Sequence, residues 1–148
     1  MEERFRMQEV DPAAFNALMA IEKYLAGTSI DPLHKELIKI RASQINGCAF
    51  CIDKHTKDAR RMGETEQRLY LLPVWREAPH FSHEERIILS MTEEITLISE
   101  KGLTNVTYVR AIAQFGLEHT AQLIMAITAI NMWNRIGVSS HRIPPIEQ

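Results

Sequence analysis

Apolar side chains recur every three or four residues along most of this 148-residue chain, and no stretch shows the alternation of a β-strand. Asp11-Pro12 and Asp31-Pro32 each place a capping side chain before a proline, a typical start of a helix. The first of these helices is expected to end at Gly27 and the second at Asn46-Gly47. The pattern predicts an all-α fold, a single-domain helical bundle over residues 1–148.

More helices are predicted after Asn46-Gly47. Ser82 and Glu85 match a capping box, which marks one helix start. The final predicted helix is apolar on nearly all sides, so we expect it to be buried centrally or at a subunit contact. The predicted helices cover residues 48–62, 64–72, 82–102, 104–115 and 117–136, with a connector over 75–81 and an extended tail at 144–146.

Charge and composition narrow the possible partners. Hydrophobic residues make up 45% of the chain, charged residues 24%, and the net charge is −2. The basic residues are interspersed with acidic ones, which predicts no nucleic-acid partner and no membrane partner. The longest apolar stretch, 123–130, is too short to span a bilayer, and residues 1–6 carry no apolar signal region. We therefore expect a cytoplasmic protein.

The two cysteines of the chain, Cys48 and Cys51, fall at the start of the helix predicted over 48–62. Residues three apart share one face of a helix, so a disulfide between them is sterically feasible. The partial positive charge at a helix N-terminus favours thiolate, the reactive form. A close pair in a reducing compartment indicates metal or redox chemistry rather than a disulfide scaffold. The sequence thus predicts a helix–turn–helix that carries a CxxC pair.

Two further residues can manage protons at this pair. His55 lies four residues after Cys51 on the same helical face, where an imidazole can accept the thiol proton or hold a relay water. Glu36 lies twelve residues before Cys48, and a hairpin at Asn46-Gly47 would bring it toward the pair, where it could orient His55. We therefore expect the catalytic set Glu36, Cys48, Cys51 and His55.

Other interpretations of the pair stay open. Two buried cysteines can be inert core residues, and a zinc site would need a distant histidine or a second subunit to complete it. We expect neither a metal nor a cofactor. A thioredoxin-type motif follows a strand, whereas a helix precedes this pair. We interpret His119, Phe50 and residues 131–135 first as structural or packing features rather than as substrate contacts.

The stretch ELIKIRASQINGCAFC over residues 36–51, followed by His55, resembles the alkylhydroperoxidase AhpD core of the carboxymuconolactone decarboxylase-like superfamily. The resemblance is closest over residues 31–63, and residues 131–135 are similar to a stretch of related single-domain members. It implies an all-helical AhpD-like fold and a homo-oligomer, commonly a trimer or hexamer. It also implies reduction of organic hydroperoxides by a dithiol–disulfide cycle. We expect a dithiol protein or a small thiol to be the reductant.

The resemblance also implies residue roles. In the family the second cysteine attacks the peroxide, which is Cys51 here, and Cys48 resolves the intermediate, with Glu36 and His55 as the proton relay. The best-known members carry a second histidine just before the attacking cysteine, where this chain has Phe50. Decarboxylases of the superfamily generally lack the cysteine pair, which argues against lactone decarboxylation here.

The choice of attacking sulfur can also be argued from the residues alone. The helix-end field favours Cys48, whereas proximity to His55 favours Cys51. We take Cys51, because a specific base also manages the proton. The residues thus predict thiol redox chemistry, and the resemblance implies that the protein is a thiol-dependent peroxidase. The alternatives are a reductase of protein or small-molecule disulfides and a non-enzymatic redox-sensing oligomer.

Overall fold

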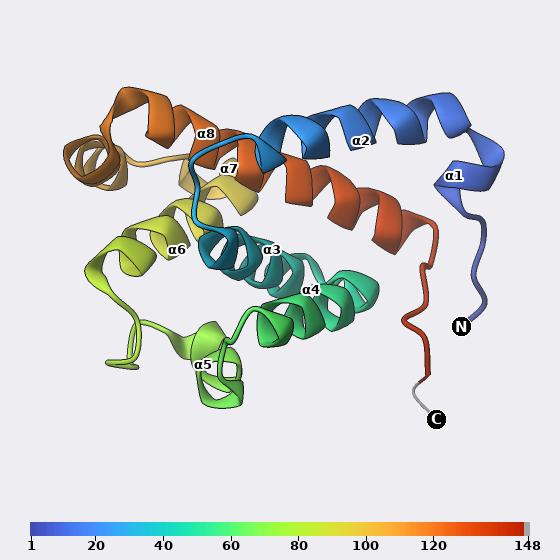
Figure 1. Cartoon of the computed structure of the whole chain (residues 1–148), viewed down its shortest axis with the longest axis horizontal. Helices are drawn as coiled ribbons and strands as arrows, with labels where there is room; N and C mark the ends of the chain where they lie inside the picture. Colours follow the sequence, from blue (N-terminus) through green and yellow to red (C-terminus); the bar gives the residue numbers. More distant parts are fainter. Residues whose placement is uncertain (147–148) are drawn as a thin grey trace.

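The computed structural model describes residues 1–146 and contains helices but no strand in that part of the chain (Figure 1). The all-α prediction is therefore confirmed. The elements in chain order are α1 Met7–Val10, α2 Pro12–Ala26, α3 Pro32–Asn46, α4 Ala49–Arg61, α5 Glu66–Leu71, a 3-10 turn Leu72–Val74, α6 His83–Thr96, α7 Ile98–Lys101 and α8 Asn105–Ser139.

The predicted helix starts and stops are confirmed by their hydrogen bonds. The Asp11 carboxylate accepts the Ala14 N–H at 3.0 Å, and the Asp31 carboxylate accepts the Leu33 N–H at 2.8 Å. Ser82 forms the predicted capping box at the start of α6. Because Gly47 is left-handed, with φ of 70°, the chain turns sharply between α3 and α4. The start of α3 and the turn at Gly47 together position the cysteine pair.

Helix α3 is packed on several sides, since it contacts α4, α6 and α8. Figure 1 shows α2 lying along α8, with α3 and α4 together on the other side of α8. Ile38 of α3 joins a central core with α6 and α8, while Leu37 joins a second core beneath the segment from α5 to Phe81. Neither side chain is more than 1% exposed. Burial in two cores fixes α3, and with it the turn that leads to the cysteines.

The structure departs from the predicted boundaries in the second half. The helix predicted to run to Gly102 ends at Thr96, because Leu97 leaves helical geometry (φ −93°, ψ 44°) before the short α7 begins. The helices predicted over 104–115 and 117–136 both lie within α8. They meet at a kink where predicted, because the backbone of Gly116 is not helical (φ 77°, ψ 172°). The sequence analysis did not predict α1.

Helix α8 is buried on only part of its surface. Leu123 and Ile127 lie in the central core, whereas Leu117, Met125 and Val138 are exposed. The expectation of central burial is therefore met on one face of the helix only, and burial of the rest at a subunit contact stays a prediction. Over residues 1–146, no helix has the length and apolar character that a membrane span requires.

Candidate redox site

The site is centred on the turn between α3 and α4. Cys48 caps the N-terminus of α4, Cys51 lies in its first turn, and a disulfide joins the two across a Cα–Cα distance of 5.3 Å. The Cys48 N–H donates to the Ser43 carbonyl at 3.0 Å, which closes the left-handed turn. The predicted helix–turn–helix with its CxxC pair is confirmed. The exposed fractions of Cys48 and Cys51 are 2% and 5%.

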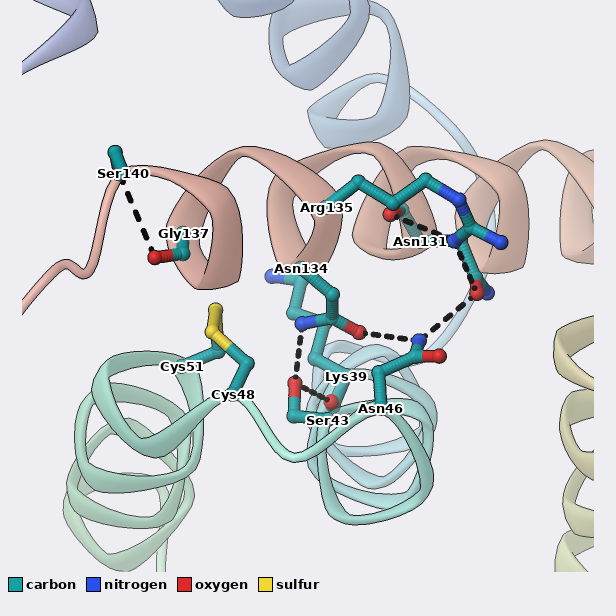
Figure 2. The surroundings of a disulfide bond; sticks show 10 residues. All are labelled: Lys39, Ser43, Asn46, Cys48, Cys51, Asn131, Asn134, Arg135, Gly137 and Ser140. Atoms are coloured by element: carbon teal, nitrogen blue, oxygen red, sulfur yellow. Dashed lines mark hydrogen bonds between the residues drawn. A yellow bond between two sulfur atoms is a disulfide. The ribbon is translucent and has the colours of Figure 1, made fainter.

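Helix α8 approaches the disulfide at Gly137, which Figure 2 shows directly facing the sulfur atoms. A methyl group on residue 137 would lie 3.0 Å from the Cys48 Sγ and 3.7 Å from the Cys51 Sγ. Glycine therefore permits the close contact between α8 and the disulfide. Gly137 was not among the residues predicted for the site. The available signal was a glycine inside a helix, which costs about 1 kcal/mol relative to alanine and indicates a packing reason.

Three amide side chains hold the turn against α8 (Figure 2). The Asn46 Nδ2 donates to the Oδ1 atoms of Asn131 and Asn134, at 2.9 and 3.0 Å. The Asn134 Nδ2 then donates to the Ser43 Oγ at 2.9 Å, and Asn134 is fully buried. Because buried amides need partners, this network fixes one relative position of α3 and α8. Asn131 and Asn134 thus have the packing role expected for residues 131–135.

The hairpin predicted at Asn46-Gly47 brings Glu36 to His55. The Glu36 Oε2 and the His55 Nδ1 are 2.8 Å apart, and the Glu36 Oε1 accepts a bond from the Lys39 Nζ at 2.8 Å. Burial on its own would raise the pKa of Glu36. The hydrogen bond from His55 and the positive charge of Lys39 outweigh burial, so the pKa of Glu36 lies below its ordinary value of 4.5.

An ionised Glu36 also determines the tautomer of His55. A carboxylate can only accept, so the His55 Nδ1 carries the hydrogen and donates it to Glu36. In the neutral imidazole the Nε2 then keeps its lone pair and can act as a base. Asp58 lies further away, with its Oδ2 3.8 Å from the same nitrogen. The arrangement is that of an oriented general base.

A pocket of about 440 Å³ lies beside this base. Cys51 and His55 both line its wall, whereas Cys48 and Glu36 do not. Glu36 is therefore placed behind His55, and Cys51 is the sulfur that faces the pocket. The apolar part of the wall comes from the N-terminal segment, α2, α4 and α8, and consists of Phe5, Met7, Phe15, Met19, Phe50, Ile130, Trp133, Ile136 and Gly137. Most of these wall residues were not predicted from the sequence.

The C-terminal tail folds back over Phe50. His141 takes a left-handed conformation (φ 52°), and the Arg142 N–H donates to the Gly137 carbonyl at 2.9 Å, which ends α8 in a Schellman motif. The Arg142 guanidinium then lies 5.0 Å from the centre of the Phe50 ring. Its Nη1 is also 2.5 Å from the Glu3 Oε1. Phe50 is thus covered by Arg142, and Arg142 in turn links the C-terminal tail to Glu3.

One group of side chains has the donor atoms for a cation. Ligand atoms of Glu36, His55 and Asp58 all lie within 4.8 Å of one another. Cationic side chains already bind both carboxylates, Lys39 on Glu36 and Lys54 on Asp58. The donor set therefore fits an oriented histidine better than a divalent metal. This group includes neither cysteine, and the expectation of no metal stays a prediction.

His119 lies elsewhere. Its Nδ1 is 3.2 Å from the Ser29 Oγ, and its ring stacks on Phe115 with the ring centres 5.2 Å apart. It is not part of the pocket wall. These contacts agree with the structural interpretation of this histidine.

The all-helical fold and the CxxC pair between two helices define an AhpD-like protein. The chain belongs to the carboxymuconolactone decarboxylase family, whose model matches residues 12–94, from α2 through most of α6. The match therefore includes the turn with both cysteines, together with Glu36 and His55.

Relatives of similar length support this assignment. The chain is 45% identical over 139 residues to the uncharacterized protein YdfG of Bacillus subtilis, covering 94% of this chain and 95% of that one. It is 39% identical to a protein of unknown function from Agrobacterium tumefaciens that is provisionally described as the antioxidant defence protein AhpD. That crystal structure superposes with a TM-score of 0.95 over 99% of this chain and all of the other. An uncharacterized peroxidase-related protein from Silicibacter has the same fold, with a TM-score of 0.80 at 22% identity over 91% of this chain and 72% of that one.

Proposed function

We propose that this protein is a thiol-dependent peroxidase that reduces organic hydroperoxides through a Cys48/Cys51 dithiol–disulfide cycle. The observation that carries the proposal is that Cys51 and His55 line one pocket, while Glu36 orients His55 from behind. The description of the Agrobacterium relative as an antioxidant defence protein supports the same chemistry.

The proposed first step is attack by the Cys51 thiolate on the terminal oxygen of the hydroperoxide. A sulfur–oxygen bond forms as the oxygen–oxygen bond breaks, which leaves a sulfenic acid on Cys51. The His55 Nε2 takes the thiol proton beforehand and gives it to the departing alkoxide, which leaves as the alcohol. Glu36 stabilises the imidazolium that exists between these two events, because its carboxylate accepts the Nδ1 hydrogen.

Cys48 completes the cycle. Its thiol attacks the Cys51 sulfur, a disulfide forms, and the sulfenic oxygen leaves as water. A dithiol reductant, on a protein or a small molecule, then restores both thiols by exchange and becomes a disulfide itself. The assignment of attack to Cys51 is supported by access, because Cys51 lines the pocket whereas Cys48 is covered by Gly137.

Several wider properties belong to the same proposal. We propose that residues 1–148 act as one domain in the cytoplasm, with no nucleic-acid or membrane partner. We also propose a homo-oligomer, a trimer or hexamer, as the family resemblance implies. An apolar groove over α6 to α8 supports self-association, since its wall includes Ile95, Ile98, Leu103, Ile124 and Met132.

The proposal is tested with purified protein and a dithiol reductant. Reductant-dependent loss of an organic hydroperoxide is expected, and Cys51→Ser should abolish turnover. Undiminished activity in that variant would overturn the assignment. Reduction of insulin or of a small disulfide without any peroxide rate would point to a disulfide reductase. A change of oligomeric state on oxidation without turnover would point to a redox sensor.

A further inference from the structure

We propose that the pocket selects an uncharged, bulky, apolar hydroperoxide over hydrogen peroxide, and that Phe5 of the N-terminal segment and Met19 of α2 are specificity-determining residues. This inference rests on the proposed peroxidase function and specifies its substrate class. Four observations carry it, namely the size of the pocket, its aromatic wall, the pairing of its charges and the anchoring of the N-terminal segment.

The pocket is much larger than the O–O group of a peroxide requires. Its volume is about 440 Å³, whereas a water molecule occupies roughly 30 Å³ in the liquid and hydrogen peroxide is only slightly larger. A cavity of this size falls in the range that encloses a drug-sized organic ligand. The space beside Cys51 therefore fits the organic part of a hydroperoxide.

The wall opposite α4 is aromatic and fixed in place. The Trp133 Nε1 donates to the Glu22 Oε1 at 2.9 Å, and the rings of Trp133 and Phe15 pack in a T-shaped arrangement with ring centres 5.8 Å apart. Since Glu22 uses the only polar atom of the indole, a ligand in the pocket meets the carbon surface of the ring. A rigid aromatic wall of this kind favours an apolar ligand.

The cations in the pocket wall are paired, and Glu22, a carboxylate in the wall, accepts the hydrogen bond from Trp133. Each of these cations has a carboxylate partner within residues 1–146, which would have to be displaced by an anionic ligand. An uncharged ligand needs no such displacement. The pairs are Arg6 with Glu3 at 3.1 Å, Lys39 with Glu36 at 2.8 Å, Lys54 with Asp58 at 2.5 Å and Arg142 with Glu3 at 2.5 Å.

The N-terminal segment is tied to the end of α8, which holds Phe5 at the pocket. The Arg4 N–H donates to the Ser140 carbonyl at 2.9 Å, and the Arg4 Nη1 donates to the Ser139 carbonyl at 3.1 Å. The Glu3–Arg142 ion pair adds a third link. Figure 1 shows the N-terminus and the stretch that follows α8, up to residue 146, on the same side of the molecule. The outer wall is thus built from two chain ends that hold each other.

The first test compares kcat/KM for cumene hydroperoxide and for hydrogen peroxide with the same dithiol reductant. Phe5 and Met19 are 38% and 44% exposed, so alanine at either position leaves the core intact. Phe5→Ala and Met19→Ala should each lower kcat/KM for cumene hydroperoxide by about tenfold and change that for hydrogen peroxide by less than about twofold. Val10→Ala and Tyr24→Ala are matched controls, since both residues are exposed neighbours outside the pocket wall. An equal decrease in kcat/KM for both peroxides, or no decrease for either, would overturn the inference.

A second test measures binding without turnover. The alcohol product 2-phenylpropan-2-ol is titrated into the oxidised protein by calorimetry. Binding that weakens about tenfold in Phe5→Ala and Met19→Ala is the expected result, and binding unaffected by both variants would contradict it. If the alcohol binds to wild type and more weakly to both variants while no peroxide is consumed, the protein is not a peroxidase but the pocket is still an apolar ligand site. If peroxides are reduced without any preference for size and the alcohol does not bind, the function stands and this inference fails.

Discussion

Gly137 of α8 lies directly against Cys48, so close that a single methyl group on residue 137 would stand 3.0 Å from the Cys48 Sγ. A contact this tight needs the sulfur or the helix to shift. Alanine normally stabilises a helix by about 1 kcal/mol relative to glycine, whereas overpacking costs about 1–3 kcal/mol. The net effect of alanine at residue 137 on stability is the difference between these two terms, and the overpacking cost is smaller the further the disulfide can move.

Gly137→Ala should therefore fail to show the usual stabilisation. We expect the free energy of unfolding of the oxidised protein to fall by about 0–2 kcal/mol, measured by denaturant titration. Gly27→Ala is the matched control, because its new methyl group would make only an ordinary 3.5 Å contact. If Gly137→Ala instead raised the free energy of unfolding by about 1 kcal/mol, the contact with the disulfide would not restrict the side chain at residue 137.

The Glu36–His55 pair should affect the chemical step more than the fold. His55→Ala removes the base and should lower the rate of peroxide reduction by about 10²-fold or more. Glu36→Gln keeps a hydrogen-bonding group but removes the negative charge that fixes the Nδ1 hydrogen, so a smaller loss of about tenfold is expected. Asp58→Asn serves as the control, since Asp58 is 3.8 Å from the same nitrogen. If Asp58→Asn slowed the reaction as much as Glu36→Gln, the orienting role of Glu36 would be wrong.

The low pKa of Glu36 predicts a pH-dependent contribution to stability. A carboxyl whose pKa is lower in the folded than in the unfolded state stabilises the fold fully above the unfolded pKa, near 4.5, and less as pH falls through the folded pKa. The stability advantage of wild type over Glu36→Gln should therefore shrink as the pH falls below about 4.5, because Glu36 then becomes protonated in both the folded and the unfolded state. Denaturant titrations from pH 7 to pH 3 measure it. A difference that stays constant to pH 3 would contradict the assigned direction.

Asn134 is expected to be a stability residue. Asn134→Ala removes a buried amide and leaves the Ser43 hydroxyl and an Asn46 N–H without this partner. Loss of such a network should destabilise the protein by about 2–4 kcal/mol, measured by thermal or chemical unfolding. Asn16→Ala, at an exposed position on α2, should change stability by less than about 0.5 kcal/mol. Equal effects of the two substitutions would exclude a role of Asn134 in holding α3 against α8.

The first half of the site could be predicted from the sequence because it depends on local rules. Asp31-Pro32 starts α3, Gly47 ends it, and the hairpin that follows brings Glu36 to His55. Gly137 and Trp133 could not be predicted in the same way, since they reach the site from α8 through contacts that span more than eighty residues. Helical periodicity shows that a face is buried but not which element covers it.

The central claim is that Cys51 is the sulfur that reacts with peroxide, and site-resolved mass spectrometry tests it most directly. Reduced Cys48→Ser and Cys51→Ser proteins are each treated with one equivalent of an organic hydroperoxide and a sulfenic-acid trapping reagent. The account predicts a trapped sulfenic acid on Cys51 in Cys48→Ser and almost none on Cys48 in Cys51→Ser. Trapping on Cys48 in Cys51→Ser, with Cys51 unmodified in the other variant, would contradict it.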